Sequence, residues 1–180
     1  MIITIDGPAG AGKSSISKAL AEKLGFTYLD SGAMYRALAL YLLQRGIDPG
    51  DEEQVLPCLK AVDISFRNAH IFLNSEDVSG LIRTPEVDSA SSAVSRIPAV
   101  RKWLTRLQQK MQEHGNIVAE GRDMGTVVFP DADYKFFLTA SAEERARRRL
   151  AQMGYDKKDI VRFETILQQI KNRDKSDSSG

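Results

Sequence analysis

The sequence predicts an α/β fold in which helices flank a parallel sheet, because short apolar runs and helical periods alternate along the chain. The β-branched run Ile2–Asp6 is followed by a glycine-rich loop, and apolar residues then recur at helical spacing over 14–24. A second apolar run at 26–29 and a second amphipathic helix at 33–45 repeat this order. Two further apolar strands, with the pattern of buried core strands, follow later in the chain: 116–119 and 134–138.

The composition suits one compact domain and argues against several classes of partner. Of the 180 residues, 42% are hydrophobic and 27% are charged, and the 25 basic residues nearly balance the 24 acidic ones. A net charge of +1 favours neither nucleic acid nor an anionic membrane surface. The single Cys58 allows no disulfide framework, and we find neither a secretion leader nor an apolar run of roughly 18 residues. We therefore expect a cytoplasmic monomer that binds small molecules.

A segment in the middle of the chain interrupts the alternation. A helix is predicted over 51–61, and the runs Ile64–Arg67 and 71–73 then predict a β-hairpin. The simplest explanation is an insertion of residues 64–93, closed by a polar helical stretch after Pro85. Further helices are predicted in the second half of the chain, the last two joined by a polar segment: 99–114, 142–152 and 160–173.

The glycine-rich loop matches the pattern G-x-x-x-x-G-K-[ST] and lies between a predicted strand and a predicted helix, the context that supports the match. Small residues let backbone N–H groups turn toward an anion, and the following helix N-terminus adds positive partial charge. Lys13 can reach the β- and γ-phosphates of a nucleoside triphosphate, and the Ser14 hydroxyl can ligate Mg²⁺. The alternative is an ordinary glycine turn. The residues that we expect to hold the triphosphate are Gly7, Pro8, Ala9, Gly10, Ala11, Gly12, Lys13, Ser14 and Ser15.

This loop is shared by switches, motors and kinases, so the acceptor must be inferred from other residues. A kinase of a phosphorylated acceptor brings two polyanions together and needs arginines outside the loop. The stretch Asp30-Ser31-Gly32-Ala33-Met34-Tyr35-Arg36 follows the second strand and opens a helix. Ser31 could cap that helix, and Arg36 would project about one turn further on. The alternative is a plain N-cap with a surface arginine.

Polar residues also gather where the strand at 116–119 ends, in Glu120-Gly121-Arg122-Asp123-Met124-Gly125-Thr126. Ligands of open α/β sheets collect at this edge. Arg122 can hold a phosphate, Asp123 can accept a hydrogen bond from an exocyclic amine, and Glu120 could contact magnesium or its water shell. The alternative is a salt-bridged turn.

Taken together, five blocks of the sequence resemble the bacterial cytidylate kinase family, and the likeness runs from Ile2 to Asp177. The blocks are G-P-A-G-A-G-K-S-S, L-D-S-G-A-M-Y-R, D-V-S-G-L-I-R-T-P-E-V, E-G-R-D-M-G-T-V-V-F-P-D-A and K-N-R-D-K-S-D. The resemblance implies a P-loop nucleoside monophosphate kinase fold with a parallel sheet core, a β-containing NMP-binding insertion and a short lid. It implies ATP and Mg²⁺ as co-substrate and metal. We expect the core at 1–63, 94–151 and 161–180, the insertion at 64–93 and the lid at 152–160.

The resemblance also implies roles for individual residues. It places near the phosphate and sugar of the acceptor Ser31, Arg36, Arg122 and Arg173. It assigns Asp177 to the ribose, and it places near cytosine Ser92, Arg101 and Asp123. Cytosine carries an N4 amino donor where uracil has a carbonyl, so a carboxylate opposite uracil would be left unpaired. We therefore expect CMP to be favoured over UMP.

Several arginines follow in the run Arg145, Arg147, Arg148 and Arg149, of which the first shares a helix face with the last two. In the family, a lid arginine covers the transferred phosphoryl group. The alternatives are a solvated helix face and a nucleic-acid patch, the latter opposed by the balanced charge. The catalytic residues that we expect are Lys13, Arg122, Arg145, Arg148 and Arg173.

The expected reaction is direct transfer of the ATP γ-phosphoryl group to CMP or dCMP, giving ADP and CDP or dCDP. The acceptor oxygen is already ionised at neutral pH, so catalysis rests on positioning and charge neutralisation. The alternatives are a kinase of UMP, AMP or another metabolite, and a switch protein that transfers nothing. Because the family continues through a further strand and helix, we expect the C-terminal strand and helix to be absent from these 180 residues.

Overall fold

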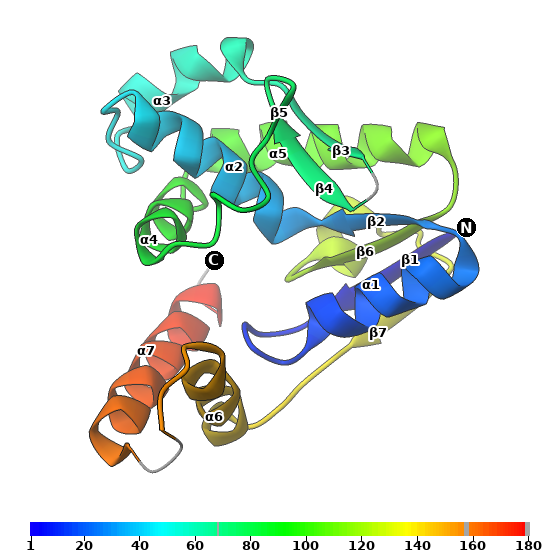
Figure 1. The fold of residues 1–180 in the computed structure, drawn as a ribbon. Helices are drawn as coiled ribbons and strands as arrows, with labels where there is room; N and C mark the ends of the chain where they lie inside the picture. The colour runs from blue at the N-terminus through cyan, green and yellow to red at the C-terminus, as the bar shows by residue number, and fades with distance from the viewer. Residues whose placement is uncertain (68, 157–158, 179–180) are drawn as a thin grey trace.

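A computed structural model gives the fold of the chain (Figure 1). It describes residues 1–67, 69–156 and 159–178, without the side chains of 114 and 176–178. Its core is a four-stranded sheet with the order β2-β6-β1-β7, and all of its strand pairs are parallel. The strands are β1 (Ile2–Asp6), β2 (Thr27–Asp30), β6 (Ile117–Gly121) and β7 (Tyr134–Phe137). The predicted parallel α/β core is therefore confirmed.

Helices cover both faces of this sheet, as the alternation along the strands requires. On one face, Ile3, Ile5 and Val118 pack with Ala21 of α1 (Lys13–Leu24). On the other face, Ile2 and neighbouring strand residues join the larger core, which includes α2 (Ser31–Gln44) and α5 (Pro98–Lys110). Successive side chains of a strand point to opposite faces of the sheet. Because both faces of β1 and β6 are covered, all of their residues are buried, and their sequences are mostly apolar.

The predicted hairpin is present and forms part of a second, antiparallel sheet. Its strands are β3 (Ile64–Arg67), β4 (His70–Leu73) and β5 (Glu76–Asp77). The two-residue strand β5 is too short to leave a pattern in the sequence. Helix α4 (Pro85–Val94) follows, capped by the Thr84 hydroxyl, and packs on α2. Helix α3 (Glu52–Cys58) and a 3₁₀ turn (Leu59–Ala61) precede this sheet.

The last two helices, α6 (Ala142–Gln152) and α7 (Ile160–Ser178), form a lobe beside the sheet (Figure 1). We call residues 142–178 the α6/α7 lobe. A small core of Ala146, Leu150 and Ile166 holds the two helices together. A single extended connection leads from β7 to this lobe (Figure 1).

The predicted ends of two helices and the predicted burial of one strand were wrong. The apolar strand at 134–138 was expected to be buried, yet Tyr134 is 53% and Phe137 is 71% exposed. The physical reason is its place at the sheet edge, where, among the residues that the structure describes, it pairs with β1 alone. The helix predicted over 99–114 is α-helical only to Lys110 and continues as a 3₁₀ turn (Met111–His114), whereas α7 extends past 173.

Candidate active site

The glycine-rich loop joins β1 to α1 and has a backbone that only glycine adopts without strain. Gly7 has φ +147°, and a Cβ atom there would lie 2.0 Å from the carbonyl oxygen of Leu138. Gly12 precedes α1 with φ +101°. Both values lie in the left-handed region, where a side chain meets the backbone. The loop therefore holds its N–H groups at the start of α1, the arrangement that binds phosphate.

Lys13, the first residue of α1, is buried within this loop. Its ammonium group donates to the carbonyl oxygen of Pro8 at 2.9 Å. Burial and the nearby charge of Arg122 lower the pKa of Lys13 to about 8, against the opposing charges of Glu120, Asp30 and Asp6. A cation placed where it loses hydration binds an incoming anion strongly.

Carboxylates stand at the carboxyl ends of three neighbouring strands. Glu120 of β6 is buried and accepts a hydrogen bond from the Tyr28 hydroxyl, and Ser14 also contacts it. Burial and the charge of Asp30 raise the pKa of Glu120 above its ordinary value. Asp6 of β1 accepts from the backbone N–H groups of 124 and 125, both at 2.8 Å. Asp6 and Tyr28 were not singled out from the sequence, because only strand pairing brings them to this edge.

Arg122 and Asp123 follow β6 and face two different partners. Arg122 donates to the carbonyl oxygen of Gly7 at 2.9 Å, so it lies against the phosphate loop. Asp123 forms an ion pair with Arg101 of α5, with 2.9 Å between nitrogen and oxygen. Tyr35 of α2 lies near this pair: burial and the charge of Asp123 raise the pKa of Tyr35 to about 12, while Arg101 opposes the shift. The structure thus brings together two of the three residues expected around cytosine.

The start of α2 differs from the prediction. Asp30, not Ser31, caps this helix, because its carboxylate accepts from the Ala33 N–H at 2.9 Å. Ser31 is the first helical residue and is buried, and its hydroxyl oxygen would lie 2.6 Å from a Cβ at Gly121. Both residue types are good caps, and the β-region backbone at position 30 decides between them.

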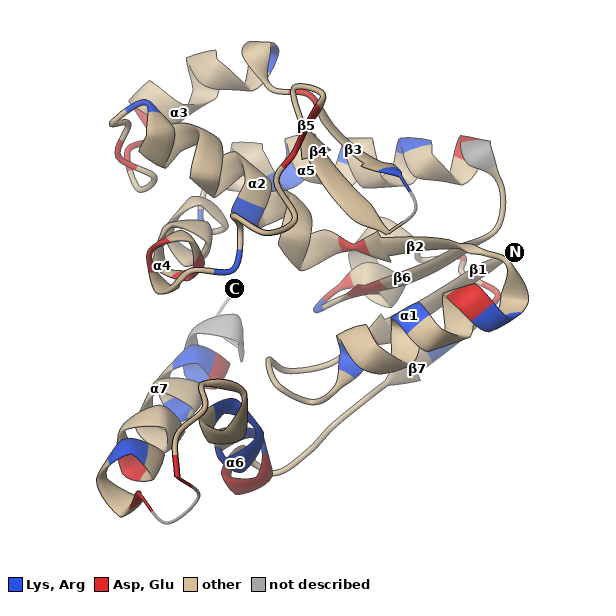
Figure 2. Ribbon diagram, viewed as in Figure 1, with Lys and Arg blue, Asp and Glu red and all other residues tan. Residues whose placement is uncertain are grey.

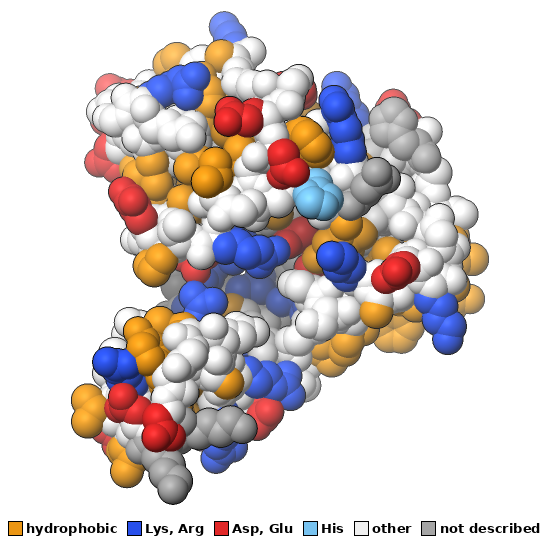
Figure 3. Space-filling view, in the orientation of Figure 1, with side chains coloured by type: hydrophobic (Ala, Val, Ile, Leu, Met, Phe, Trp, Pro, Cys, Tyr) orange, Lys and Arg blue, Asp and Glu red, His pale blue; other side chains and the backbone are white. Residues whose placement is uncertain are grey.

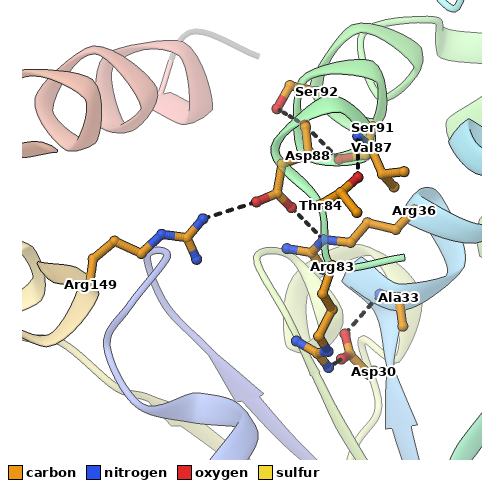
Figure 4. Close-up of polar contacts among 10 residues, drawn as sticks. All are labelled: Asp30, Ala33, Arg36, Arg83, Thr84, Val87, Asp88, Ser91, Ser92 and Arg149. Atoms are coloured by element: carbon orange, nitrogen blue, oxygen red, sulfur yellow. Dashed lines mark hydrogen bonds and ion pairs between the residues drawn. The ribbon is translucent and has the colours of Figure 1, made fainter. Parts of the chain in front are cut away.

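Arg36 and Ser92 lie on facing helices (Figure 4). Arg36 Nε donates to Asp88 Oδ1 of α4 at 2.7 Å, and Ser92 Oγ donates to the backbone carbonyl of the same residue at 3.1 Å. Arg83 approaches Asp30 at 3.6 Å from the loop before α4. Neither Asp88 nor Arg83 was singled out, since their partners are distant in sequence.

Arg145, Arg148 and Arg149 of α6 reach toward the cleft, while Arg147 points to the exposed side, as the helical spacing predicts. Glu144 lies 3.7 Å from Arg147 and also accepts from Arg148 Nε at 2.9 Å. Arg145 is buried and donates to both oxygens of Asp174 in α7, at 2.9 and 2.5 Å, and to the carbonyl of Ala9. Arg148 donates to the carbonyl of Ala11 at 3.1 Å. The α6/α7 lobe is thereby attached to the phosphate loop.

The remaining two predicted residues lie on α7. Arg173 precedes Asp174 and is partly exposed. Asp177 belongs to the last turn, and its side chain lies outside the described residues. The ribbon has Lys and Arg positions on α6, on α7 and on segments that face them, among others (Figure 2), and a space-filling view shows Lys and Arg side chains around the hollow between the α6/α7 lobe and the rest of the molecule (Figure 3).

Comparison with known proteins shows the family. A family model described as cytidylate kinase matches residues 3–180. The cytidylate kinase of Caldanaerobacter subterraneus subsp. tengcongensis is 52% identical over 176 residues, which cover 98% of this chain and 78% of the relative. The chain belongs to the cytidylate kinase family. The cytidylate kinase of Carboxydothermus hydrogenoformans is 48% identical over 99% of this chain and 82% of the relative. That of Escherichia coli O1:K1 / APEC is 49% identical over 98% of this chain and 79% of the relative.

Membership of the cytidylate kinase family agrees with the geometry around the loop. The family uses ATP as its co-substrate, and the phosphate loop supplies a site of matching chemistry. The parallel sheet flanked by helices is that of a P-loop nucleoside monophosphate kinase. Over the residues that the structure describes, no helix combines the length and apolar character needed to cross a membrane.

Proposed function

We propose that the cleft between the phosphate loop, the carboxyl edge of the sheet and the α6/α7 lobe is the site at which ATP phosphorylates CMP or dCMP. The chain is an ATP-dependent nucleoside monophosphate kinase that yields ADP and CDP or dCDP, as its family membership shows. One observation supports the placement above all. Arg122 contacts the backbone of Gly7, while its neighbour Asp123 pairs with Arg101, so adjacent residues connect the donor loop with the base-reading group.

We place the triphosphate of ATP on residues 7–15. The loop N–H groups and the start of α1 receive its phosphates, and Lys13 exchanges its Pro8 carbonyl for the β- and γ-phosphate oxygens. Ser14 and Ser15 are exposed at the start of α1. The buried ammonium group gains more from this exchange than an exposed lysine would.

A magnesium ion fits the same edge. Ser14 and Glu120 are in hydrogen-bonding contact, and hydroxyl and carboxylate oxygens are the donors that Mg²⁺ takes, either directly or through its waters. The pKa of Glu120 is raised by burial and by the negative charge of the neighbouring Asp30. A bound cation would offset the negative charge of these two carboxylates. Ser14 and Glu120 would hold the ion, which would supply positive charge to offset the negative charge of the transferred phosphoryl group.

The acceptor phosphate is proposed to bind arginines that enter the cleft from different segments: Arg36, Arg122 and Arg173. Ser31 lies at the start of α2 beside Gly121 and is proposed to contact the phosphate or sugar of the acceptor. Asp177 is proposed as the ribose ligand. The nucleotide oxygen attacks the γ-phosphorus in line, so these residues act by holding two polyanions in register.

Cytosine is proposed to bind beside α4 and α5 and to contact Ser92 of α4, Arg101 of α5 and Asp123, which follows β6. The ion pair between Arg101 and Asp123 is about half exposed and presents a carboxylate to a ligand. That carboxylate accepts from the N4 amino group of cytosine and repels the O4 carbonyl of uracil. The preference for CMP over UMP follows from this difference in hydrogen bonding.

The α6 arginines are proposed to serve the phosphoryl group in two ways. Arg148 is about half exposed and lies against the loop carbonyl of Ala11, within the region of the donor phosphates. Arg145 is buried among Asp174 and the carbonyls of Ala9 and Ala140, so it acts by fixing the loop and α7 in place. Of the two α6 arginines expected to be catalytic, Arg148 is therefore proposed to contact the phosphoryl group, and Arg145 is proposed to be a positioning residue.

We further propose that residues 64–93 close over the acceptor and residues 152–160 over the donor, on a core of 1–63, 94–151 and 161–180; of these ranges, residues 68, 157–158 and 179–180 lie outside the described residues. Closure excludes water and limits ATP hydrolysis. The chain is proposed to act as a cytoplasmic monomer. It is also proposed to have no nucleic-acid partner, which the net charge of +1 supports.

A coupled ADP-release assay tests this proposal. CMP and dCMP are expected to raise release well above the ATPase rate without acceptor, and UMP and AMP to raise it less. The assignment is wrong if UMP, AMP or a non-nucleotide acceptor is preferred. A chain that binds ATP but transfers to no acceptor would support the switch alternative.

A further inference from the structure

Asp88 is a carboxylate in the cleft to which the proposed mechanism gives no task. It lies in the first turn of α4, and about one fifth of its side chain is exposed. Figure 4 shows this carboxylate between two arginines that approach from opposite sides. Arg36 comes from α2 in the same half of the molecule, whereas Arg149 comes from α6 across the cleft.

Each oxygen of Asp88 accepts from one arginine. Arg36 Nε lies 2.7 Å from Oδ1, and Arg149 Nη2 lies 3.1 Å from Oδ2. Burial by itself would raise the pKa of Asp88, but the hydrogen bonds and charges of the two arginines outweigh it and hold the pKa below its ordinary value. The group is therefore ionised at neutral pH, and a single anion joins two cations that lie 113 residues apart in the sequence.

The contact with Asp88 engages the Nε side of the Arg36 guanidinium group. Asp88 engages Nε, while Nη1 lies against the start of α2, 3.0 Å from where a Cβ at Gly32 would stand. The guanidinium is thus anchored through Nε, and this bond restricts the orientation of its plane in the nucleotide-free protein. Arginine recognises phosphate with two parallel N–H donors, so the orientation of that plane controls the strength of binding.

The contact with Arg149 joins the two sides of the cleft. Arg149 is about half exposed and extends from α6 to α4. A nucleotide phosphate carries more charge than one carboxylate and has several acceptor oxygens, so it competes with Asp88 for this arginine once it enters the cleft. In the nucleotide-free protein, Asp88 supplies the negative charge between Arg36 and Arg149.

We propose that Asp88 is a positioning residue with two tasks: it orients Arg36 toward the acceptor phosphate, and through Arg149 it holds the α6/α7 lobe against α4 while no nucleotide is bound. The first task rests on the proposed function, because it takes Arg36 as a phosphate ligand. The second task concerns the nucleotide-free protein and stands without it.

The second task is tested by a distance measurement without nucleotide. Spin labels are placed on cysteines introduced at Glu53 of α3 and Gln152 of α6, both exposed, in a Cys58→Ser background. Asp88→Asn keeps the shape of the side chain and is expected to lengthen and broaden the distance distribution between the labels. Arg149→Gln should have the same effect, and the double variant should add nothing, because each change breaks the same contact.

Glu86→Gln is the matched control, since Glu86 lies in the same turn of α4, carries the same charge and is exposed. Its distribution should equal that of the parent. Unchanged distributions in both Asp88→Asn and Arg149→Gln, or additive effects in the double variant, would overturn this task. Because two variants on opposite sides of the cleft probe one contact, a folding defect in either leaves the other to decide.

The first task is tested by CMP binding in a double-mutant cycle, with calorimetry as readout. Asp88→Asn is expected to weaken CMP binding about fivefold in the parent but less than about twofold on an Arg36→Lys background, because the effect passes through the guanidinium. Equal weakening in both backgrounds would overturn it. If the parent itself binds and phosphorylates no CMP, the proposed function fails, while the distance result still decides the second task.

Discussion

Lys13 combines a full charge with a nearly buried position, since only 7% of the residue is exposed. Its pKa is lowered to about 8 in the folded chain, first by burial and next by Arg122, whereas an unfolded lysine titrates near 10.5. Between these two pH values, the unfolded chain binds more protons than the folded one, so the free energy of unfolding rises with pH. Below pH 8 the charged Lys13 destabilises the fold that it serves.

The first prediction follows from that charge. Lys13→Met should raise the free energy of unfolding of the nucleotide-free protein by about 1–2 kcal/mol at pH 7, and the gain should shrink as the pH rises from 8 toward 10.5. Urea unfolding at several pH values measures it. Lys18→Met on the exposed side of α1 is the control and should change little. The same Lys13→Met variant should lose at least about a hundredfold in kcat, because the γ-phosphate loses its cation.

Asp123 carries the second prediction, which concerns specificity. Asp123→Ala should lower kcat/KM for CMP by more than about tenfold while changing kcat/KM for UMP much less, because only cytosine offers an amino donor to this carboxylate. Steady-state kinetics with both acceptors measure the ratio. Asp131→Ala, an exposed aspartate after the same strand, serves as control. Equal losses with both acceptors would remove the base-reading role from Asp123.

At the scale of elements, the phosphate loop depends on a close approach between Gly7 and the segment after β7. A Cβ at Gly7 would stand 2.0 Å from the carbonyl oxygen of Leu138, in a backbone with φ +147°. Leu138 is a backbone neighbour of β1, since its N–H donates to the carbonyl of Asp6 at 2.7 Å. The loop therefore cannot move away without breaking the end of the sheet.

The third prediction tests this approach. Gly7→Ala should lower the free energy of unfolding by about 2 kcal/mol or more and abolish tight ATP binding, because the backbone clash has no flexible side chain to relieve it. Thermal unfolding and nucleotide titration measure the two effects. Gly80→Ala is the control, since a Cβ there meets nothing within 4 Å. Normal ATP binding by Gly7→Ala would contradict the geometry of the loop.

The fourth prediction concerns the attachment of α6 to α7. The hydrogen bonds that Arg145 donates to Asp174 raise the pKa of Arg145, whose side chain is 5% exposed, so this cation relies on its partner. Asp174→Asn should destabilise the α6/α7 lobe by about 2 kcal/mol, because it leaves a buried charge with weaker partners. Hydrogen exchange should then accelerate in α6 and α7 and not in β1 or β6. Glu143→Gln, whose contact with Lys171 is a long 3.9 Å, should leave exchange unchanged.

At the scale of the whole molecule, β7 forms an exposed apolar edge of the four-stranded sheet over the residues that the structure describes. Strand β7 pairs with β1 on one side, and Tyr134, Phe136 and Phe137 are all more than half exposed. An edge strand with exposed aromatic side chains is a template for association with another chain.

The fifth prediction is that Phe137→Lys reduces association at high protein concentration. Because Phe137 is 71% exposed, the change should cost little folding free energy, while a charge on the edge discourages strand pairing. Static light scattering against concentration measures it. Leu81→Lys, at another exposed apolar residue, is the control. Association that persists unchanged in Phe137→Lys would locate the contact elsewhere.

The order of elements and the glycine-rich loop between β1 and α1 were predictable because their signals are local. The pattern from Gly7 to Ser14 lies within eight consecutive residues, and its strand and helix flanks are equally close in sequence. The hairpin at Ile64–Arg67 and His70–Leu73 was predictable for the same reason. The exposure of β7 was not, because an apolar run indicates a strand but not its place in the sheet.

The sequence by itself determined that the chain binds a nucleoside triphosphate and which family it resembles, since spacing along the chain carries both. Only the tertiary structure decided which groups are partners. Asp88 meets Arg149 from 61 residues away, Asp6 holds the turn at 124–125, and Asp30 takes the cap expected of Ser31. Ion pairs and hydrogen bonds depend on distances of about 3 Å, which packing of distant segments sets and local pattern does not contain.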